Sequence, residues 1–248
     1  MQDIAAVLEQ SVSFSKQLRD LKTKESVVGG WYGYDIMGNL VHLERLLAAD
    51  RRRLLGSVKN RRIADIGCAD GDLGFFMESL GCSVDFVDFP GTNWNGMRGV
   101  RRLKELLDST AQVHEVNLDE YFALPSSHYE LVFFLGILYH LKNPFYVLEK
   151  LARSAKHLLV STRVFRQVPD GLSVDGRSLS YLVSADESEN GDATNYWIFT
   201  RFALLRLFDR TGWEVLDFIT VGDQDRSDPH SAAHDERAFA LLKTRIAM

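Results

Sequence analysis

Residues 63–77 decide the fold, and they read Ile-Ala-Asp-Ile-Gly-Cys-Ala-Asp-Gly-Asp-Leu-Gly-Phe-Phe-Met. Residues 63–66 are a short apolar run that predicts a buried β-strand, and residues 67–72 are a glycine-containing turn. Residues 73–80 then predict a helix, which stops at Gly81. A strand, a tight turn and a helix in this order predict a βα unit that binds a nucleotide.

Three acidic residues in this turn select among nucleotide ligands. They are Asp65, Asp70 and Asp72, while Gly67 and Gly71 let the backbone approach a ligand because they lack Cβ. A dinucleotide site must hold an anionic pyrophosphate at the helix N-terminus, and three carboxylates would repel it. S-adenosylmethionine fits better, since it carries a sulfonium, an ammonium group and a ribose but no phosphate. We therefore expect this cofactor, with S-adenosylhomocysteine as the product.

The turn resembles the first motif of class I S-adenosylmethionine-dependent methyltransferases. Its core, Asp-Ile-Gly-Cys-Ala-Asp-Gly over residues 65–71, is similar to the usual acid-x-Gly-x-Gly-x-Gly and departs at the middle glycine, where Ala69 stands. A purely structural βα turn is the alternative, because such a pattern alone is a weak indication. The resemblance implies that the cofactor is held by Asp65, Gly67, Cys68, Ala69, Asp70 and Gly71.

A second strand strengthens this prediction. Residues 83–87 are rich in apolar side chains and end at Asp88, about 20 residues past the turn, where an acid is expected to hydrogen-bond the ribose hydroxyls of a nucleoside. Phe89 follows and is placed to pack on the adenine. The alternative is that Asp88 is an ordinary loop acid before Pro90.

Two more strand ends are expected at the cofactor. Residues 113–116 predict a third strand, and the resemblance implies that Asn117 and Leu118 after it meet the adenine. Residues 131–135 show no polar alternation, as in a central parallel strand that is covered on both faces. Gly136 is expected to end that strand at the cofactor edge.

The acid/base candidates follow directly. Residues 135–144, Leu-Gly-Ile-Leu-Tyr-His-Leu-Lys-Asn-Pro, resemble the fourth-strand motif of bacterial methyltransferases related to the tRNA wobble-uridine carboxymethyltransferase. Tyr139 and His140 are the catalytic candidates, because a neutral histidine near pH 7 can take a proton from an acceptor hydroxyl or amine. Alternatively, His140 only shapes the loop and in-line placement of the reactants supplies the rate.

Other side chains are predicted to bind the acceptor. Trp94 lies in a polar and aromatic loop after the second strand, and residues 166–192 form a long Gly/Ser/Asp-rich segment that we interpret as a substrate lid. Arg163, at its entrance, could hold an acidic acceptor or the carboxyl group of carboxy-S-adenosyl-L-methionine, or could be a salt-bridge residue. The resemblance implies that Tyr196 and Trp197 line the acceptor site; a packed aromatic core at a helix entry is the alternative.

The predicted organisation is one α/β domain with additions. Residues 1–59 are expected to form an N-terminal helical extension, with helices over residues 3–24 and 39–55. Residues 60–248 are expected to form the methyltransferase domain, with an insertion at about residues 164–195. Five alternating βα units and a closing strand pair predict a Rossmann-like, seven-stranded, mostly parallel sheet with helices on both faces.

Composition limits the class of protein. The 248 residues are 46% hydrophobic, which is enough for a full core. No run of about 18 apolar residues occurs and the N-terminal Met-Gln-Asp does not lead into an apolar segment, so we expect a cytoplasmic protein without a membrane partner. Cys68 and Cys82 cannot make a disulfide framework, and no Cys/His spacing predicts a metal.

The predicted function is direct methyl transfer from the sulfonium to a small-molecule acceptor. A net charge of −5 argues against a broad nucleic-acid footprint. A tRNA wobble-uridine methyltransferase or carboxymethyltransferase is kept as an alternative because of the wobble-uridine resemblance and of two basic clusters: Arg51, Arg52 and Arg53 with Arg61 and Arg62, and Arg98, Arg101 and Arg102 with Lys104. A protein that binds S-adenosylmethionine without turnover is a second alternative.

Overall fold

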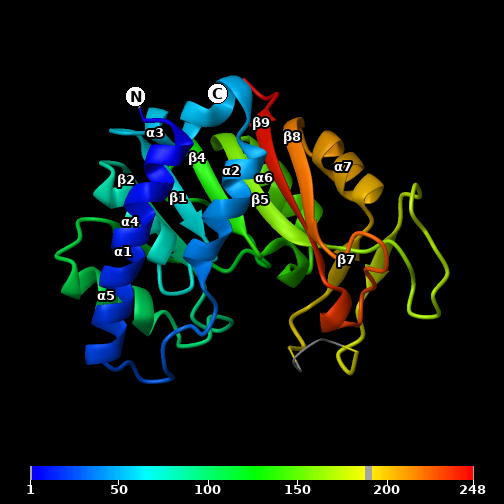
Figure 1. The fold of residues 1–248 in the computed structure, drawn as a ribbon, viewed down its shortest axis with the longest axis horizontal. Helices are drawn as coiled ribbons and strands as arrows, with labels where there is room; N and C mark the ends of the chain where they lie inside the picture. Colours follow the sequence, from blue (N-terminus) through cyan, green and yellow to red (C-terminus); the bar gives the residue numbers. More distant parts are fainter. Residues whose placement is uncertain (1, 188–191, 248) are drawn as a thin grey trace. The chain divides into compact units, whose positions relative to one another are not determined.

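The structure is a computed structural model that describes residues 2–187 and 192–247. The chain folds as two compact units, residues 1–133 and residues 134–248. Strands and helices alternate along the chain, as the sequence predicts (Figure 1). The strands are mostly parallel and are flanked by helices, which confirms the predicted Rossmann-like α/β class.

The first unit contains four parallel strands in the order β3-β2-β1-β4. Their bounds are Arg62–Ile66 for β1, Ser83–Asp88 for β2, Gln112–Glu115 for β3 and Tyr129–Leu135 for β4, whose last two residues belong to the second unit. Because parallel strands end at the same edge of a sheet, the segments after β1, β2 and β3 lie near one another. The predicted cofactor residues of this unit are in these segments.

Helices of the first unit pack on this sheet in layers. Helix α4 (Asp72–Ser79) lies against β1 and β2, and the rings of Phe75 and Phe86 are 4.5 Å apart. Helix α1 (Ile4–Lys24) packs outside α4, where the rings of Phe14 and Phe76 are 5.6 Å apart (Figure 1). Helix α5 (Arg98–Leu106) connects β2 to β3.

The prediction of one helix over residues 39–55 is wrong. The segment consists of the 3₁₀ turn η1 (Ile36–Asn39), helix α2 (Leu40–Leu46), the 3₁₀ turn η2 (Ala49–Arg53) and the short helix α3 (Leu54–Ser57). Leu43, Leu46 and Leu47 are all fully buried and share one helix face, so the hydrophobic spacing favours a helix up to this point. The helix ends there because Leu47, with φ −85° and ψ 75°, and Ala49, with φ 51°, leave the helical backbone conformation.

The second unit is built around the long strand β5 (Ala155–Val164). Strand β9 (Glu236–Thr244) runs antiparallel to β5, with residues 236–243 paired to residues 157–164. Strand β8 (Trp213–Gly222) runs antiparallel to β9. Helix α6 (Pro144–Ala152) packs on β5, and helix α7 (Arg201–Arg210) packs on β8. The 3₁₀ turn η3 (Leu138–His140) follows β4.

The predicted lid segment has a folded core, which the sequence analysis did not foresee. It contains strand β6 (Ser180–Leu182), which pairs antiparallel with β7 (Trp197–Phe199), and β7 pairs with β5. These additions bring the strands in the described residues to nine, where seven are predicted. A small hydrophobic core consists of Phe165, Val174, Val183 and Ile198, with Val168 and Tyr181 packed against it.

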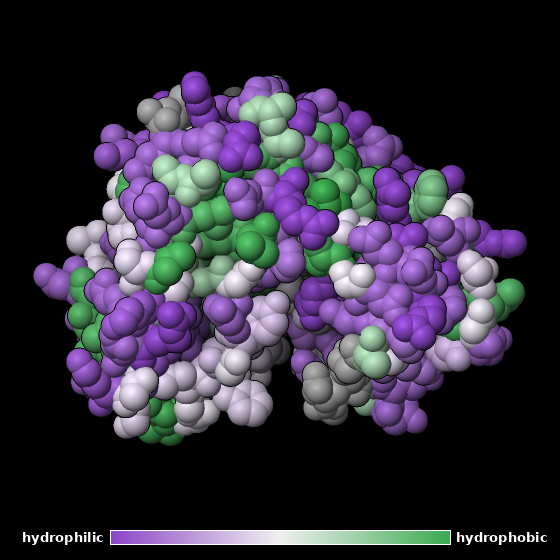
Figure 2. All heavy atoms as spheres, viewed as in Figure 1, coloured by the Kyte–Doolittle hydropathy of each residue, from purple (hydrophilic) through white to green (hydrophobic). Residues whose placement is uncertain are grey.

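Figure 2 shows mostly hydrophilic residues on the face seen in Figure 1, with hydrophobic residues in smaller groups. Among the described residues, no helix has both the length and the apolar character that a membrane span needs.

Candidate functional site

The turn after β1 takes its shape from left-handed backbone conformations. Gly67, Ala69 and Gly71 have φ angles of 68°, 54° and 86°, so Ala69 adopts, without a glycine, the conformation for which glycine is usual. A Cβ on Gly71 would lie 2.9 Å from side-chain atoms of both Phe75 and Val100. Gly71 therefore allows close packing of α4 on the sheet, whereas the sequence predicts that it makes room for a ligand.

Asp88 connects the end of β2 to this turn. Its Oδ1 accepts a hydrogen bond from the Phe89 backbone N–H at 2.8 Å, and its Oδ2 accepts from the Ala69 backbone N–H at 3.2 Å and from Asn93 Nδ2 at 3.0 Å. Burial raises the pKa of Asp88, and these donors partly oppose that shift. The structure thus brings together Asp88, Phe89 and Ala69, as the sequence predicts.

Asp65 belongs to β1 and contacts the first turn of α4. Its side chain is 6% exposed, and its Oδ2 accepts the Gly74 backbone N–H at 3.1 Å. Burial raises the pKa of Asp65 to about 7, because one backbone donor does not replace the lost water. The Cys68 side chain is buried as well, and burial raises the pKa of its thiol. Cys68 is thus a small, inert filler of the turn.

The other two acids of the turn are bound by a lysine of the N-terminal helix. Lys22 Nζ is 2.9 Å from Asp70 Oδ2 and 2.8 Å from Asp72 Oδ1. Asp70 Oδ2 also accepts the Tyr32 backbone N–H at 2.8 Å, and Asp70 Oδ1 accepts from Asn95 Nδ2 at 2.8 Å. Asp70 therefore connects the turn to Lys22 of α1, to Tyr32 and to Asn95.

Sequence reasoning missed Lys22, although a pattern in the sequence points to it. Lys22 lies four residues after Leu18, which is one of the buried residues of α1. Residues four apart share a helix face, and a lysine on a buried face needs an acidic partner. The three acids in the turn are the partners that such a lysine would be expected to find.

Two asparagines build the loop between β2 and α5. Asn93 Oδ1 accepts the backbone N–H groups of Asn95 and Met97 at 3.2 and 2.8 Å. Asn95 is completely buried, and its Nδ2 donates to the Gly30 carbonyl at 3.1 Å. Trp94 between them is 71% exposed, so its ring is open to solvent.

The predicted adenine-side residues lie beside Asp88. The Val116 backbone N–H donates to the Asp88 carbonyl at 2.8 Å, which brings the end of β3 to the end of β2. Asn117 then donates through Nδ2 to Glu120 Oε1 at 2.9 Å, and Leu118 is 8% exposed. The structure therefore groups Asp88, Phe89, Asn117 and Leu118 at one sheet edge.

These residues fit S-adenosylmethionine. The strand ends and the turn present four carboxylates, of which Asp65 and Asp70 are buried, and Asp88 stands at the end of β2 where a ribose is expected. Carboxylates suit a ligand with cationic groups and hydroxyl donors and disfavour a pyrophosphate. The fold and the residues of the first unit therefore agree with the predicted cofactor.

His140 is the centre of a second group of predicted residues, in the second unit. Its Nδ1 lies 2.9 Å from Thr194 Oγ1 and 3.8 Å from Asp192 Oδ2, and its ring centroid is 4.2 Å from that of Tyr139. The Tyr196 backbone N–H donates to the Tyr139 carbonyl at 2.8 Å. Burial lowers the pKa of His140, which favours the neutral base near pH 7.

The aromatic residues before α7 join this group. Trp197 Nε1 donates to the Lys142 carbonyl at 3.2 Å, and Lys142 Nζ lies 5.9 Å from the centroid of the Tyr196 ring. Tyr139, His140, Tyr196 and Trp197 are all half-buried. The structure thus brings all four predicted residues together around η3, with part of each side chain accessible.

Arg163 and Gly136 have structural partners in the second unit. Arg163 is 4% exposed, and its Nε lies 2.8 Å from Asp235 Oδ1, which agrees with the salt-bridge alternative. Gly136 has a φ of 77°, and its N–H donates to the Ser161 carbonyl at 3.0 Å. Gly136 thus ends β4, as predicted.

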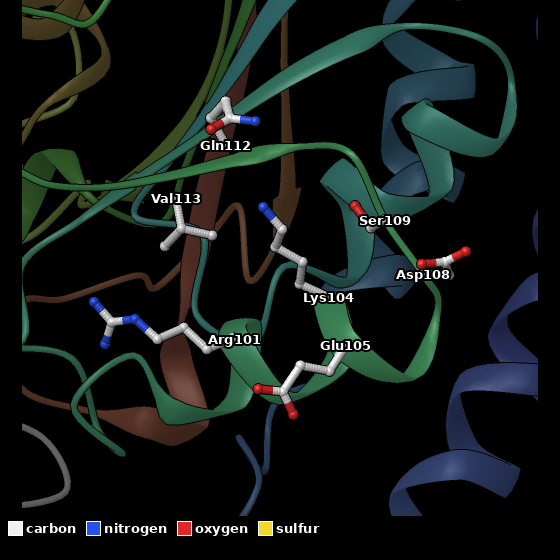
Figure 3. A pocket seen from close by; sticks show the side chains of 7 residues that line it. All are labelled: Arg101, Lys104, Glu105, Asp108, Ser109, Gln112 and Val113. Atoms are coloured by element: carbon white, nitrogen blue, oxygen red, sulfur yellow. The ribbon is translucent and has the colours of Figure 1, made fainter.

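A separate hollow of about 520 Å³ lies on α5 and the segment that follows it (Figure 3). Its lining mixes acidic and basic side chains and contains none of the predicted site residues: Arg101, Lys104, Glu105, Asp108, Ser109, Gln112 and Val113. Lys104 Nζ donates to the Ala111 carbonyl at 2.5 Å. In the part of the chain that the structure describes, no group of three or more His, Cys, Asp or Glu side chains could hold a metal ion.

Comparison with known families identifies the class of the chain. A family model described as a methyltransferase domain matches residues 40–217, which is more than half of the chain. The chain therefore belongs to this family of methyltransferases. This membership confirms the predictions of a methyltransferase and of S-adenosylmethionine as its cofactor. The match does not single out the tRNA wobble-uridine group.

Solved structures show the same fold at low sequence identity. The N-terminal domain of EvdMO1, crystallised in the presence of SAH and D-fucose, has a TM-score of 0.60 at 14% identity, over 99% of this chain and 98% of that one. The [4+2]-cyclase SpnF has a TM-score of 0.60 at 13% identity, over 94% of this chain and 93% of that one.

A third solved structure is a methyltransferase with a small heterocyclic ligand. It is the 1,6-didemethyltoxoflavin-N1-methyltransferase of Burkholderia thailandensis, with bound 1,6-didemethyltoxoflavin and S-adenosylhomocysteine. Its TM-score is 0.51 at 16% identity, over 77% of each chain. No curated protein matches the chain.

Proposed function

We propose that this member of the methyltransferase family transfers a methyl group from S-adenosylmethionine to a hydroxyl or amine of a small molecule. The observation that carries this proposal is the grouping of Tyr139, Tyr196 and Trp197 around a half-buried His140, whose pKa is lowered by burial. Half-buried aromatic rings provide flat apolar surface for a small acceptor, and a neutral histidine provides a base.

In this proposal most of the cofactor contacts come from the first unit, and Gly136 of the second unit adds one. Asp88 binds the ribose hydroxyls, and Phe89, Asn117 and Leu118 meet the adenine. When bound, the cofactor supplies the methyl group on a sulfonium and leaves as the neutral thioether S-adenosylhomocysteine. The remaining contacts come from the turn and from the end of β4: Asp65, Gly67, Cys68, Ala69, Asp70, Gly71 and Gly136.

The second unit binds and deprotonates the acceptor. His140 takes the proton that the acceptor hydroxyl or amine loses, and then returns it to solvent. Tyr139 is the second acid/base candidate, and Tyr196 and Trp197 hold the acceptor. Trp94 remains a predicted acceptor contact because its exposed ring offers apolar surface.

A tRNA acceptor receives less support from the structure. Arginines of the predicted basic clusters pair with acids: Arg52 with Asp3, Arg62 with Asp85, Arg101 with Glu115 and Arg102 with Glu25. Carboxylate partners reduce the positive charge available to phosphates. Both D-fucose and 1,6-didemethyltoxoflavin, in the similar structures, are small molecules.

The carboxylated cofactor also receives less support than S-adenosylmethionine. Arg163 is paired with Asp235, and Arg166 Nε and Nη2 both donate to the Glu236 carboxylate at 2.8 Å. These acids already satisfy the guanidinium groups that would bind an added carboxylate.

We also propose a cytoplasmic location, because the two cysteines are free thiols, as suits a reducing compartment.

Transfer of a deuterated methyl group tests the proposal. The full chain is incubated with S-adenosylmethionine that carries a deuterated methyl group, together with a panel of phenols, sugars, heterocycles and amines or, in parallel, with bulk tRNA. Mass spectrometry should find the label on a member of the small-molecule panel. Label on tRNA alone would contradict the proposal in favour of the tRNA alternative. Cofactor binding without any transfer would favour the non-catalytic alternative.

A further inference from the structure

We propose that Thr194 and Asp192 are positioning residues that fix His140 in the tautomer whose Nε2 can accept a proton. The inference rests on the proposed function of His140 as the base, and it assigns that role to one ring nitrogen. All three residues belong to the second unit and lie in the described part of the chain.

The hydrogen-bond partners of Nδ1 decide the tautomer. Nδ1 lies 3.3 Å from the Thr194 backbone carbonyl, and a carbonyl oxygen can only accept a hydrogen bond. The Thr194 hydroxyl, 2.9 Å from Nδ1, has a single proton. That hydroxyl lies 2.5 Å from Asp192 Oδ1, and an ionised carboxylate also only accepts.

Only one arrangement of protons satisfies all of these contacts. The Thr194 hydroxyl donates to Asp192, so its oxygen is left to accept from His140. Nδ1 must then carry the proton of the neutral ring, and the lone pair lies on Nε2. Asp192 therefore orients the Thr194 hydroxyl, and Thr194 in turn orients the imidazole.

Further hydrogen bonds hold Asp192 and Thr194 in place. The Thr194 backbone N–H also donates to Asp192 Oδ1 at 2.9 Å, which fixes the carboxylate against its own loop. The Tyr196 backbone N–H donates to the Tyr139 carbonyl at 2.8 Å, which fastens the Thr194 segment to η3. These bonds fix the positions of Asp192 and Thr194. A shift of the ring proton from Nδ1 to Nε2 would therefore cost His140 its hydrogen bonds at Nδ1.

The charged and titratable neighbours of His140 agree with a neutral ring. Burial lowers the pKa of His140, the nearby Asp192 carboxylate raises it, and Arg237 lowers it. The guanidinium of Arg237 lies 5.8 Å from the centre of the Tyr139 ring, which itself packs against His140 at an interplanar angle of 42°. The Asp192 carboxylate opposes the lowering of the pKa, which favours proton transfer to His140.

Nitrogen NMR of the full chain, labelled with ¹⁵N-histidine, tests the tautomer directly and needs no acceptor. The spectrum of His140→Gln assigns the His140 ring nitrogens. We expect protonated Nδ1 and unprotonated Nε2 in the wild type at neutral pH and in Thr194→Ser, which keeps the hydroxyl. In Thr194→Val and Asp192→Asn the fraction protonated at Nε2 should rise. Thr23→Val, an exposed threonine on α1, should leave the His140 signals unchanged.

Two NMR results would overturn the proposal. One is a wild-type His140 that is protonated at Nε2, and the other is a folded Thr194→Val protein with the wild-type spectrum. Circular dichroism reports whether each variant folds. If Thr194→Val does not fold, the wild type and Thr194→Ser still decide the tautomer.

Kinetics with an acceptor from the deuterium experiment separate this proposal from the proposed function. Thr194→Val should lower kcat about 10–100-fold with little change in KM for S-adenosylmethionine, and Thr194→Ser should restore most of the rate. Asp192→Asn should move the acid limb of the pH–rate profile to lower pH, because the carboxylate raises the pKa of His140. A full rate in Thr194→Val would contradict the positioning role. No turnover by the wild type would contradict the proposed function and leave the NMR result standing.

Discussion

The cofactor turn and the His140 group are assembled in opposite ways. In the turn, Asp88 reaches Ala69, 19 residues away, within one βαβ unit, and the protein's own donors occupy the acids. His140 instead depends on Thr194, 54 residues away, across the inserted segment. The comparison teaches that the Asp88 contacts of the proposed cofactor site form within one βαβ unit, although Lys22 of α1 also holds the turn, whereas the proposed base is held by a segment 54 residues away. Variants in one region should therefore leave the function of the other intact.

The largest expected effect is on kcat, and it should come from the His140 group without a change in cofactor affinity. His140→Gln removes the proposed base and should lower kcat about 10²–10⁴-fold. Because the change lies outside the turn, the affinity for S-adenosylhomocysteine should stay within about twofold of wild type, as measured by calorimetry. A rate near that of wild type would show that placement of the reactants, rather than a base, supplies the catalysis.

The next effect tests whether the turn depends on the N-terminal helix. Lys22→Met leaves Asp70 and Asp72 buried without their cation, and should lower the free energy of unfolding by about 3–5 kcal/mol in urea denaturation. Lys16→Met is the matched control on the same helix. Lys16 and Asp20 are exposed, so this change should cost less than about 0.5 kcal/mol. Equal effects of the two variants would contradict the buried ion pairs.

A smaller effect, on stability, should depend on pH in opposite ways for two buried acids of the first unit, Asp65 and Asp85. Burial raises the pKa of Asp65 to about 7, so its contribution to stability is present below about pH 4 and is lost as the pH rises through 7. Asp65→Asn keeps an acceptor for the Gly74 N–H and should be about 1–2 kcal/mol more stable than wild type at pH 8, with little difference at pH 4. Thermal melts between these two pH values measure the difference.

Asp85 should behave in the opposite way. Burial raises its pKa, but hydrogen bonds from Arg62 Nε at 2.8 Å and from the Tyr129 hydroxyl at 2.7 Å reverse that effect, so the pKa of Asp85 is lowered. Its contribution is therefore present above its unfolded pKa and is lost as the pH falls. Asp85→Asn should destabilise the protein near pH 7, and less so in acid. A common pH trend for Asp65→Asn and Asp85→Asn would contradict these assignments.

The smallest expected effect lies outside both regions. Arg101 pairs with Glu115 on the surface, so Arg101→Gln should change the free energy of unfolding by less than about 0.5 kcal/mol. Transfer to the acceptor should also be unchanged. A large, salt-dependent loss of tRNA binding in this variant would revive the tRNA alternative.

The sequence was enough to predict the elements around the turn. Strand β2, the αL turn and α4 lie where residues 63–88 predict them, because hydrophobic period and glycine positions are local properties. The break in residues 39–55 was not predictable from helical periodicity, since Leu43, Leu46 and Leu47 keep the spacing of one helix face up to the point where α2 ends. Hydrophobic periodicity is least informative at the ends of elements.

The candidate site was predictable to a similar extent. Asp88, Phe89, Asn117 and Leu118 follow strands, and parallel strands bring their ends together. The Thr194 contact of His140 was not foreseen, because a residue in a long insertion can meet any part of the unit. The ion pair of Arg163 was left open for the same reason, since its partner Asp235 is far along the chain.

The most direct test of the account is a calorimetric titration of S-adenosylhomocysteine into the wild type, Asp88→Asn and His140→Gln. We expect Asp88→Asn to bind about 10–100-fold more weakly, because hydrogen bonds to a charged group contribute about 1.5–3 kcal/mol. His140→Gln and the exposed control Asp108→Asn should bind as the wild type does. Wild-type affinity in Asp88→Asn, or a larger loss in His140→Gln, would contradict the claim that the first unit holds the cofactor without the base.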